Sequence, residues 1–163
     1  MKILAVIPAR AGSKGIPNKN IRIINGHPLI YYSIKNALDS GLITDVIVST
    51  DSPEVKIIAE QMGVKVKWRD ELLCGDDVTL DAVIADAIPD NTYWDYVVTM
   101  QATSPTLSVL TLDTAIKYTI DKNLDTVISA INAPHLSWGE KDGKKVPNYV
   151  ERLNRQYLPP CYM

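Results

Sequence analysis

The sequence predicts an α/β fold with an open, mostly parallel, Rossmann-like sheet and helices on both faces. Short apolar runs rich in β-branched residues recur along the chain, and segments with helical spacing separate them. Several runs are apolar on both faces of the strand, which is typical of parallel sheets. Because each crossover helix returns the chain to the same edge, we expect ligands to bind beyond the carboxyl ends of the strands.

Five segments are predicted to be strands. The clearest is Lys2–Ile7, which is almost entirely apolar. Gly63–Trp68 instead alternates apolar and polar residues, so we place it near an edge of the sheet. In chain order the predicted strands are Lys2–Ile7, Thr44–Thr50, Gly63–Trp68, Tyr96–Gln101 and Thr126–Ala130.

Four helices are predicted between or after these strands. The first begins at Pro28 and runs to about Ser40, where Gly41 is a natural terminator. The second begins at Ser52-Pro53-Glu54, which supplies an N-cap, a first-turn proline and an acidic first turn. Helical spacing predicts the other two at Val78–Ile88 and Val109–Ile120.

The strand–helix rhythm stops after Ala130. Asp142-Gly143-Lys144 is a turn signal that indicates a hairpin, and the segment that follows is polar and rich in tyrosine. We therefore predict an α/β domain over residues 1–131. Residues 132–163 are interpreted as an excursion from the sheet that serves dimerisation.

The bulk composition is that of an ordinary globular domain, with 46% hydrophobic and 22% charged residues. A net charge of -2 argues against a general binder of nucleic acids or membrane surfaces, so any anion site has to be local. Cys74 and Cys161 have no metal or redox spacing and are expected to be reduced thiols. No signal peptide or membrane span is recognised, and we expect a cytoplasmic protein.

The segment Ile7–Asn20 follows the first predicted strand and carries the chemistry. It contains three cations (Arg10, Lys14 and Lys19) together with two glycines. Glycine lets successive backbone N–H groups converge on phosphate oxygens, while arginine and lysine offset phosphate charge. The spacing fits neither a P-loop nor a dinucleotide-binding glycine motif. A solvated basic turn is the simpler alternative.

The run IPARAGSKGIPNKNI in this segment closely resembles the signature of the acylneuraminate cytidylyltransferases, also called CMP-sialic acid synthetases. Further similarities follow in the same order: LITDVIVSTDSPEV, Arg69 with the residues after it, MQATSPT and RQYLPPCYM. The resemblance covers nearly all 163 residues. It implies an enzyme in which the anomeric hydroxyl of an acidic 2-keto sugar attacks the α-phosphate of CTP and releases pyrophosphate.

The resemblance also implies roles for individual residues. Catalysis is assigned to Arg10, Lys19 and Gln101. Nucleotide binding is assigned to Ala9, Arg10, Gly12, Ser13, Lys14, Asn20, Arg69 and Thr79. Sugar binding is assigned to Gln101, Thr103, Ser104 and Arg155, with Arg155 reaching across the interface of a homodimer. The resemblance thus makes residues 1–131 the nucleotide-binding domain and gives residues 132–163 a part in the sugar site.

The sequence departs from the family pattern at two places. Thr106-Leu107 stand where the family usually has Leu-Arg, so an anion contact is missing. The Asp-x-Asp pair that holds magnesium in the family does not occur before Met163, and Asp76-Asp77 point to opposite sides of an extended chain. Mg²⁺ is therefore expected to bind together with CTP and without its usual protein ligands. By the same comparison, the chain is expected to be shorter than the family fold.

Three readings stay open at this point. Within the same class, the sugar could be an N-acylneuraminate, legionaminate, pseudaminate or the eight-carbon sugar of lipopolysaccharide. A second class is a CTP-binding module without catalysis, and a third is a structural dimerisation domain.

Overall fold

The computed structural model describes residues 1–163 except 14, 132, 134–135, 152–157, 160 and 162–163. Contacts divide the chain into two compact units, Met1–Asn123 and Leu124–Met163. The first unit holds the central sheet, and the second holds a separate hairpin. The functional assignment of residues 132–163 to dimerisation and the sugar site stays a prediction.

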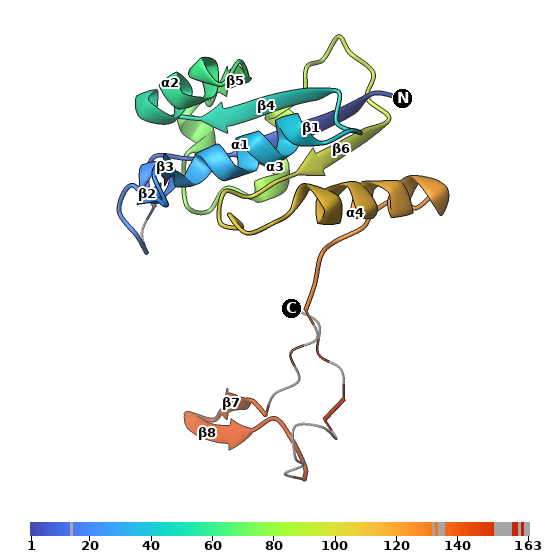
Figure 1. Cartoon of the computed structure of the whole chain (residues 1–163). Helices are drawn as coiled ribbons and strands as arrows, with labels where there is room; N and C mark the ends of the chain where they lie inside the picture. Colours follow the sequence, from blue (N-terminus) through green and yellow to red (C-terminus); the bar gives the residue numbers. More distant parts are fainter. Residues whose placement is uncertain (14, 132, 134–135, 152–157, 160, 162–163) are drawn as a thin grey trace. The chain divides into compact units, whose positions relative to one another are not determined.

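The first unit is built on a four-stranded parallel sheet (Figure 1). The strands are β1 (Ile3–Pro8), β4 (Asp45–Thr50), β5 (Lys65–Trp68) and β6 (Tyr96–Thr99), in the order β5-β4-β1-β6. Every pairing in this sheet is parallel. The predicted fold class and the edge position of β5 are confirmed.

The fifth predicted strand, Thr126–Ala130, was wrong. These residues form no strand, and Ile128 is 80% exposed. They belong to the second unit and pair with no described strand. A strand needs a neighbour that supplies backbone donors and acceptors, and β-propensity by itself provides no such neighbour.

All four predicted helices form: α1 (Leu29–Asp39), α2 (Pro53–Gln61), α3 (Leu80–Ala87) and α4 (Val109–Asp121). Ser52 caps α2 as predicted, because its side chain accepts a hydrogen bond from the Val55 amide. The helix α3 begins later than predicted because Thr79 is its N-cap and accepts from the Ala82 amide.

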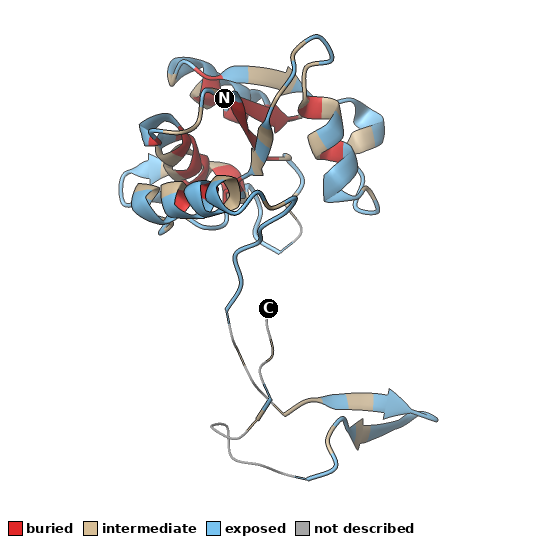
Figure 2. Cartoon of the chain, turned by 90° about the vertical axis from the view of Figure 1, so that its right-hand side faces the viewer, coloured by how far each residue is buried: buried red, intermediate tan, exposed pale blue. Residues whose placement is uncertain are grey.

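The helices cover both faces of the sheet. Ala5 and Ile7 of β1 face the larger core cluster, to which α1, α2 and α4 contribute buried residues. Leu4 and Val6 face the smaller cluster, which is closed by α3. Figure 1 shows α1 in front of the strands and α3 behind them. Figure 2 shows the buried residues gathered in these strands and on the helix faces that meet them.

The second unit contains the predicted hairpin. Strand β7 (Trp138–Lys141) pairs antiparallel with β8 (Lys144–Pro147). Asp142 and Gly143 between them have φ angles of 52° and 71°, which suit a tight two-residue turn. This confirms the turn and hairpin prediction. None of the helices in the described part of the chain has the length and apolarity needed to cross a bilayer.

Candidate functional site

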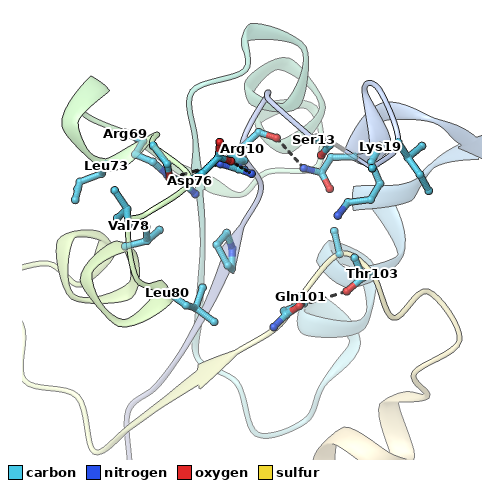
Figure 3. A pocket seen from close by; sticks show the side chains of 17 residues that line it. Arg10, Ser13, Lys19, Arg69, Leu73, Asp76, Val78, Leu80, Gln101 and Thr103 are labelled. Carbon is cyan, nitrogen blue, oxygen red and sulfur yellow. Dashed lines mark hydrogen bonds and ion pairs between the residues drawn. The ribbon is translucent and has the colours of Figure 1, made fainter. Parts of the chain in front are cut away.

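A cleft of about 670 Å³ lies beyond the carboxyl ends of the parallel strands of the first unit (Figure 3). The segment after β1 forms one wall, and the segment Arg69–Leu80 with α3 forms another. Gln101, Ala102 and Thr103, which follow β6, complete it. The topology predicts a ligand site at this edge, because the ends of neighbouring parallel strands diverge into loops there.

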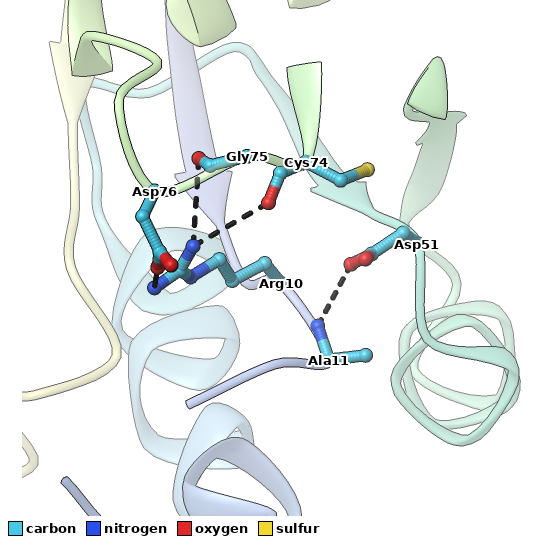
Figure 4. A network of polar contacts seen from close by, with 6 residues as sticks. All are labelled: Arg10, Ala11, Asp51, Cys74, Gly75 and Asp76. Carbon is cyan, nitrogen blue, oxygen red and sulfur yellow. Dashed lines mark hydrogen bonds and ion pairs between the residues drawn. The ribbon is translucent and has the colours of Figure 1, made fainter. Parts of the chain in front are cut away.

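Arg10 lies just after β1 and contacts the opposite wall of the cleft. Its Nη2 is 2.7 Å from Oδ1 of Asp76, and its Nη1 donates to the carbonyl oxygens of Cys74 and Gly75 at 3.4 and 3.5 Å (Figure 4). The two charged side chains are 31% and 42% exposed, so this ion pair is screened by solvent and contributes little. An arginine guanidinium in this position can also form a bidentate pair with a phosphate group.

Backbone contacts fix the start of the loop on which Arg10 lies. The Ala9 amide donates to the Ser49 carbonyl at 2.9 Å, and the Thr50 hydroxyl donates to the Ala9 carbonyl at 2.6 Å. The Ala11 amide donates to Oδ1 of Asp51 at 2.7 Å. These contacts hold both sides of Arg10 against the end of β4.

Asn20 closes the loop at its other end. Its side chain is buried, and Nδ2 donates to the Arg10 carbonyl at 3.0 Å. The neighbouring Lys19 begins a 3-10 turn (Lys19–Ile21), and Asn18 before it adopts the left-handed conformation with φ of 54°. Asparagine tolerates this conformation better than most residues. The Lys19 ammonium forms no ion pair with any described residue and lines the cleft.

Arg69 is the most buried cation of the site, with 5% of its surface exposed. Its Nε donates to the Ser49 hydroxyl at 3.2 Å, and its Nη2 donates to the Ser49 carbonyl at 3.0 Å. Burial lowers the pKa of the guanidinium, and the negative charge of Asp51 acts in the opposite direction. Because arginine stays protonated in proteins, Arg69 is a fixed positive charge at the cleft.

Gln101 and Thr103 lie on the side of the cleft where Lys19 lies (Figure 3). The Thr103 hydroxyl donates to Oε1 of Gln101 at 3.4 Å, which leaves the Gln101 amide group to donate elsewhere. The Gln101 carbonyl accepts from the Ser33 hydroxyl of α1 at 3.2 Å. Gln101 is therefore fixed by its backbone while its side chain stays exposed.

The cleft brings together seven of the residues assigned from the sequence. Those that line it are Arg10, Ser13, Lys19, Asn20, Arg69, Gln101 and Thr103. Four others do not line it: Ala9, Gly12, Thr79 and Ser104. Ala9 is buried with its backbone engaged, and Thr79 caps α3. Lys14 and Arg155 lie outside the described residues.

Sequence reasoning missed two features of the cleft. The first is Asp76, whose ion pair with Arg10 joins positions far apart in the chain. The second is an apolar wall formed by Leu73, Val78, Leu80 and Val83. Helical spacing predicts α3, but spacing does not separate residues that face a cleft from residues that face a core.

Carboxylates are scarce among the described residues that line the cleft. Asp76 is the one acidic side chain among its described lining residues, and it is engaged by Arg10. Within the described ranges, no group of three or more His, Cys, Asp and Glu residues lies close enough together to hold a metal ion. Since Mg²⁺ prefers several oxygen ligands, we assign no catalytic step to a protein-held metal here.

Cys74 is a nucleophilic residue type close to the cleft. Burial raises the pKa of its thiol, and the Asp51 carboxylate raises it further. The thiol is therefore neutral at physiological pH, and a neutral thiol is a poor nucleophile. The contact that matters is its carbonyl, which accepts from Arg10.

Comparisons with known proteins place the chain in a family. Residues 4–153 match the cytidylyltransferase family. A pseudaminic acid cytidylyltransferase of Campylobacter jejuni is 43% identical over 113 residues, which are 66% of this chain and 49% of that protein. An N-acylneuraminate cytidylyltransferase of Oncorhynchus mykiss is 34% identical over 160 residues, which are 98% of this chain and 36% of that protein.

Solved structures share the fold. A CMP:2-keto-3-deoxy-manno-octonic acid synthetase complexed with CTP matches 76% of this chain and 49% of that chain, with a TM-score of 0.66 and 24% identity. A 4-diphosphocytidyl-2C-methyl-D-erythritol synthase matches 96% of this chain and 70% of that chain, with a TM-score of 0.67 and 14% identity. At these identities the likeness concerns the fold alone.

The matched part of the chain spans about half the length of the Campylobacter relative and about a third of the Oncorhynchus relative. The family match nevertheless covers most of the chain and includes every described residue that lines the cleft. The chain belongs to the cytidylyltransferase family.

Proposed function

We propose that this protein transfers CMP from CTP to an acidic 2-keto sugar of the nonulosonate type. The observation that carries the proposal is the composition of the cleft, where three cations and an apolar wall meet at the carboxyl edge of a parallel sheet. Cations suit a triphosphate and an apolar wall suits a nucleobase. The matching relatives include enzymes named for pseudaminic, legionaminic and N-acylneuraminic acids.

The cleft suggests a direction for the nucleotide. Leu73, Val78 and Leu80 lie on the same side as Arg69, and Lys19 and Thr103 lie on the other (Figure 3). We place the base and ribose against the apolar wall and the triphosphate at Arg10, Ser13 and Lys19. The sugar then approaches from Gln101 and Thr103.

The proposed reaction needs no nucleophile from the protein. The anomeric oxygen of the sugar bonds to the α-phosphorus while the bond from that phosphorus to the bridging oxygen breaks. Pyrophosphate leaves, and the proton of the sugar hydroxyl passes to solvent. Arg10 and Lys19 hold the phosphates and offset the charge that develops on them, which is the usual source of catalysis in such transfers. Mg²⁺ is proposed to arrive bound to CTP.

Three parts of the proposal rest on the family resemblance. The protein is proposed to work as a cytoplasmic homodimer. Arg155 is proposed to reach the carboxylate of the sugar in the partner's site. The acidic sugar is proposed to be an N-acylneuraminate or a related nonulosonate, among which the described cleft offers no discriminating contact.

One observation favours a second candidate, a CTP-binding module without catalysis. Asp76 is the one carboxylate among the described lining residues, so the cleft has few ligands with which to fix a metal for the transfer step. Such a module would bind CTP in the same orientation and release no pyrophosphate.

Calorimetric titration with CTP and ATP, with and without Mg²⁺, tests the nucleotide site. Pyrophosphate release is then measured with N-acetylneuraminate, legionaminate or pseudaminate present. The transferase requires a preference for CTP and release that depends on the sugar. CTP binding without release supports the binding module, while the absence of CTP binding contradicts both.

A further inference from the structure

The end of β4 and the residue after it contact Arg69 and the two residues that flank Arg10. Ser49, Thr50 and Asp51 do not line the cleft themselves. Ser49 accepts from Arg69 through its hydroxyl and its carbonyl, and Asp51 accepts from the amide that follows Arg10. The two arginines come from different segments of the chain, so this strand end decides how they are placed relative to each other.

Asp51 binds the backbone next to Arg10, on the side away from the Arg10 side chain. Figure 4 shows its carboxylate at the Ala11 amide, while the Arg10 side chain extends the other way, towards Asp76. The bond of 2.7 Å joins an ionised acceptor to a backbone donor, which is the stronger class of hydrogen bond. Because the Ala11 amide already donates to Asp51, it is not available to a phosphate in this arrangement.

Its neighbours hold the same stretch of backbone. The Thr50 hydroxyl donates to the Ala9 carbonyl, and the Ser49 carbonyl accepts from the Ala9 amide. The residues on both sides of Arg10 are therefore tied to the end of β4 and to Asp51 just after it, which restrains the backbone from which the Arg10 side chain extends. The charge of Asp51 also favours the charged form of Arg69.

We propose that Asp51 is a positioning residue for the nucleotide site: its carboxylate fixes the Ala11 amide and thereby orients Arg10 for the triphosphate. Asp51 touches no substrate in this scheme and acts through Arg10. The inference rests on the proposed function insofar as its second readout uses CTP. Its first readout concerns the loop alone.

The first readout is hydrogen exchange of the Ala11 amide in the nucleotide-free protein, followed by NMR. The wild type is expected to protect this amide, and Asp51→Ala to lose about tenfold or more of that protection. Asp51→Asn keeps an acceptor oxygen at the same position and retains most of it. Asp51→Ser is too short to reach the amide and repeats the test should the alanine variant not fold.

The second readout is CTP affinity by calorimetry. Asp51→Ala is expected to weaken binding by about 10- to 100-fold, because a charged hydrogen bond that orders the loop is lost. Asp51→Asn should recover to within about fivefold of the wild type, since it retains the neutral part of that hydrogen bond.

Asp45 provides the matched control. It lies at the amino end of the same strand, where its carboxylate pairs with Lys65 at 2.9 Å, away from the cleft. Asp45→Ala and Asp45→Asn should leave both readouts unchanged.

A double-mutant cycle separates positioning from a general effect on stability. If Asp51 acts through Arg10, Asp51→Ala should change CTP affinity by less than about threefold when Arg10 is already alanine. Equal losses in the two backgrounds, or undiminished protection of the Ala11 amide in Asp51→Ala, would overturn the proposal. If the wild type does not bind CTP, the proposed function fails, while the exchange readout still decides whether Asp51 fixes the loop.

Discussion

Charge organises the cleft at the residue scale. The three cations of the cleft differ in their surroundings. Arg10 forms an ion pair with Asp76, and Arg69 is buried against Ser49. Lys19 forms no ion pair with a described residue. The protein as a whole carries a net charge of -2. The attraction for a polyanion is therefore local to this edge of the sheet, which suits a single nucleotide better than a polymer.

Replacing Arg10 by alanine should lower turnover by at least about 100-fold, the usual loss when an electrostatic contact to the transition state is removed. Steady-state pyrophosphate release measures this. Arg22→Ala is the matched control, because Arg22 is exposed and does not line the cleft. Unchanged turnover in Arg10→Ala would remove Arg10 from the mechanism.

If Arg10 binds the triphosphate as proposed, Asp76 competes with phosphate for its guanidinium, so neutralising Asp76 should strengthen nucleotide binding. We expect Asp76→Asn to tighten CTP binding by about two- to fivefold, which corresponds to a solvent-screened ion pair worth up to about 1 kcal/mol. Calorimetry at low and high salt checks this, and the gain should shrink as salt rises. Asp77→Asn, beside it but outside the cleft, should change little. Weaker binding in Asp76→Asn would assign Asp76 to the substrate site.

At the scale of secondary-structure elements, the residues at which helices begin determine where the walls of the cleft lie. The apolar wall lies on and just before α3, and the start of that helix is set by the Thr79 hydroxyl. The opposite wall depends on a single 3-10 turn, whose entry requires the left-handed conformation of Asn18. Neither start follows from apolar spacing, because spacing indicates which face of a helix is buried and not which residue begins it.

Thr79 has two candidate roles that one pair of variants separates. As an N-cap, Thr79→Ala should lower the free energy of unfolding by about 1 kcal/mol, and Thr79→Asn should restore it, because asparagine is at least as good a cap. Urea denaturation measures this change. Ser108→Ala at the start of α4 removes an equivalent cap and is the stability control.

The role of Thr79 in binding is read from CTP affinity in the same variants. If Thr79 serves the helix alone, Thr79→Ala and Ser108→Ala should bind CTP as the wild type does. A loss of affinity confined to Thr79→Ala would support the nucleotide contact implied by the family resemblance.

At the scale of the whole molecule, the described cleft lies within one of the two units. Every described residue that lines it lies within Met1–Asn123, as does the sheet that carries it. The second unit has its own hairpin. Its role in dimerisation and in sugar recognition stays a prediction.

A chain that ends at Asn123 should therefore fold and bind CTP with an affinity within about threefold of the 163-residue chain, because binding follows the contacts that line the site. Circular dichroism and calorimetry check folding and affinity. A larger loss would show that residues after 123 contribute to the nucleotide site. Sugar-dependent pyrophosphate release is expected to be lost, since the proposed sugar contact Arg155 is removed.

Much of the fold can be predicted from short stretches of neighbouring residues. The buried run at Ile3–Ile7, the alternation at Lys65–Trp68 and the Ser52-Pro53-Glu54 helix start each predict their element from a few neighbouring residues. Thr126–Ala130 has an equally strong strand composition and forms none. The difference is that a strand depends on a partner elsewhere in the chain, whereas a helix satisfies its own backbone.

The sequence by itself determined the fold class, the family resemblance and the three cations that line the described cleft, because these depend on residue types and their order. Only the tertiary structure decided that Asp76 holds Arg10, that Ser49 holds Arg69 and that Asp51 fixes the loop between them. These contacts join residues 20 to 66 positions apart. Such pairs arise from the way parallel strands bring their carboxyl ends to one edge, which no local pattern specifies.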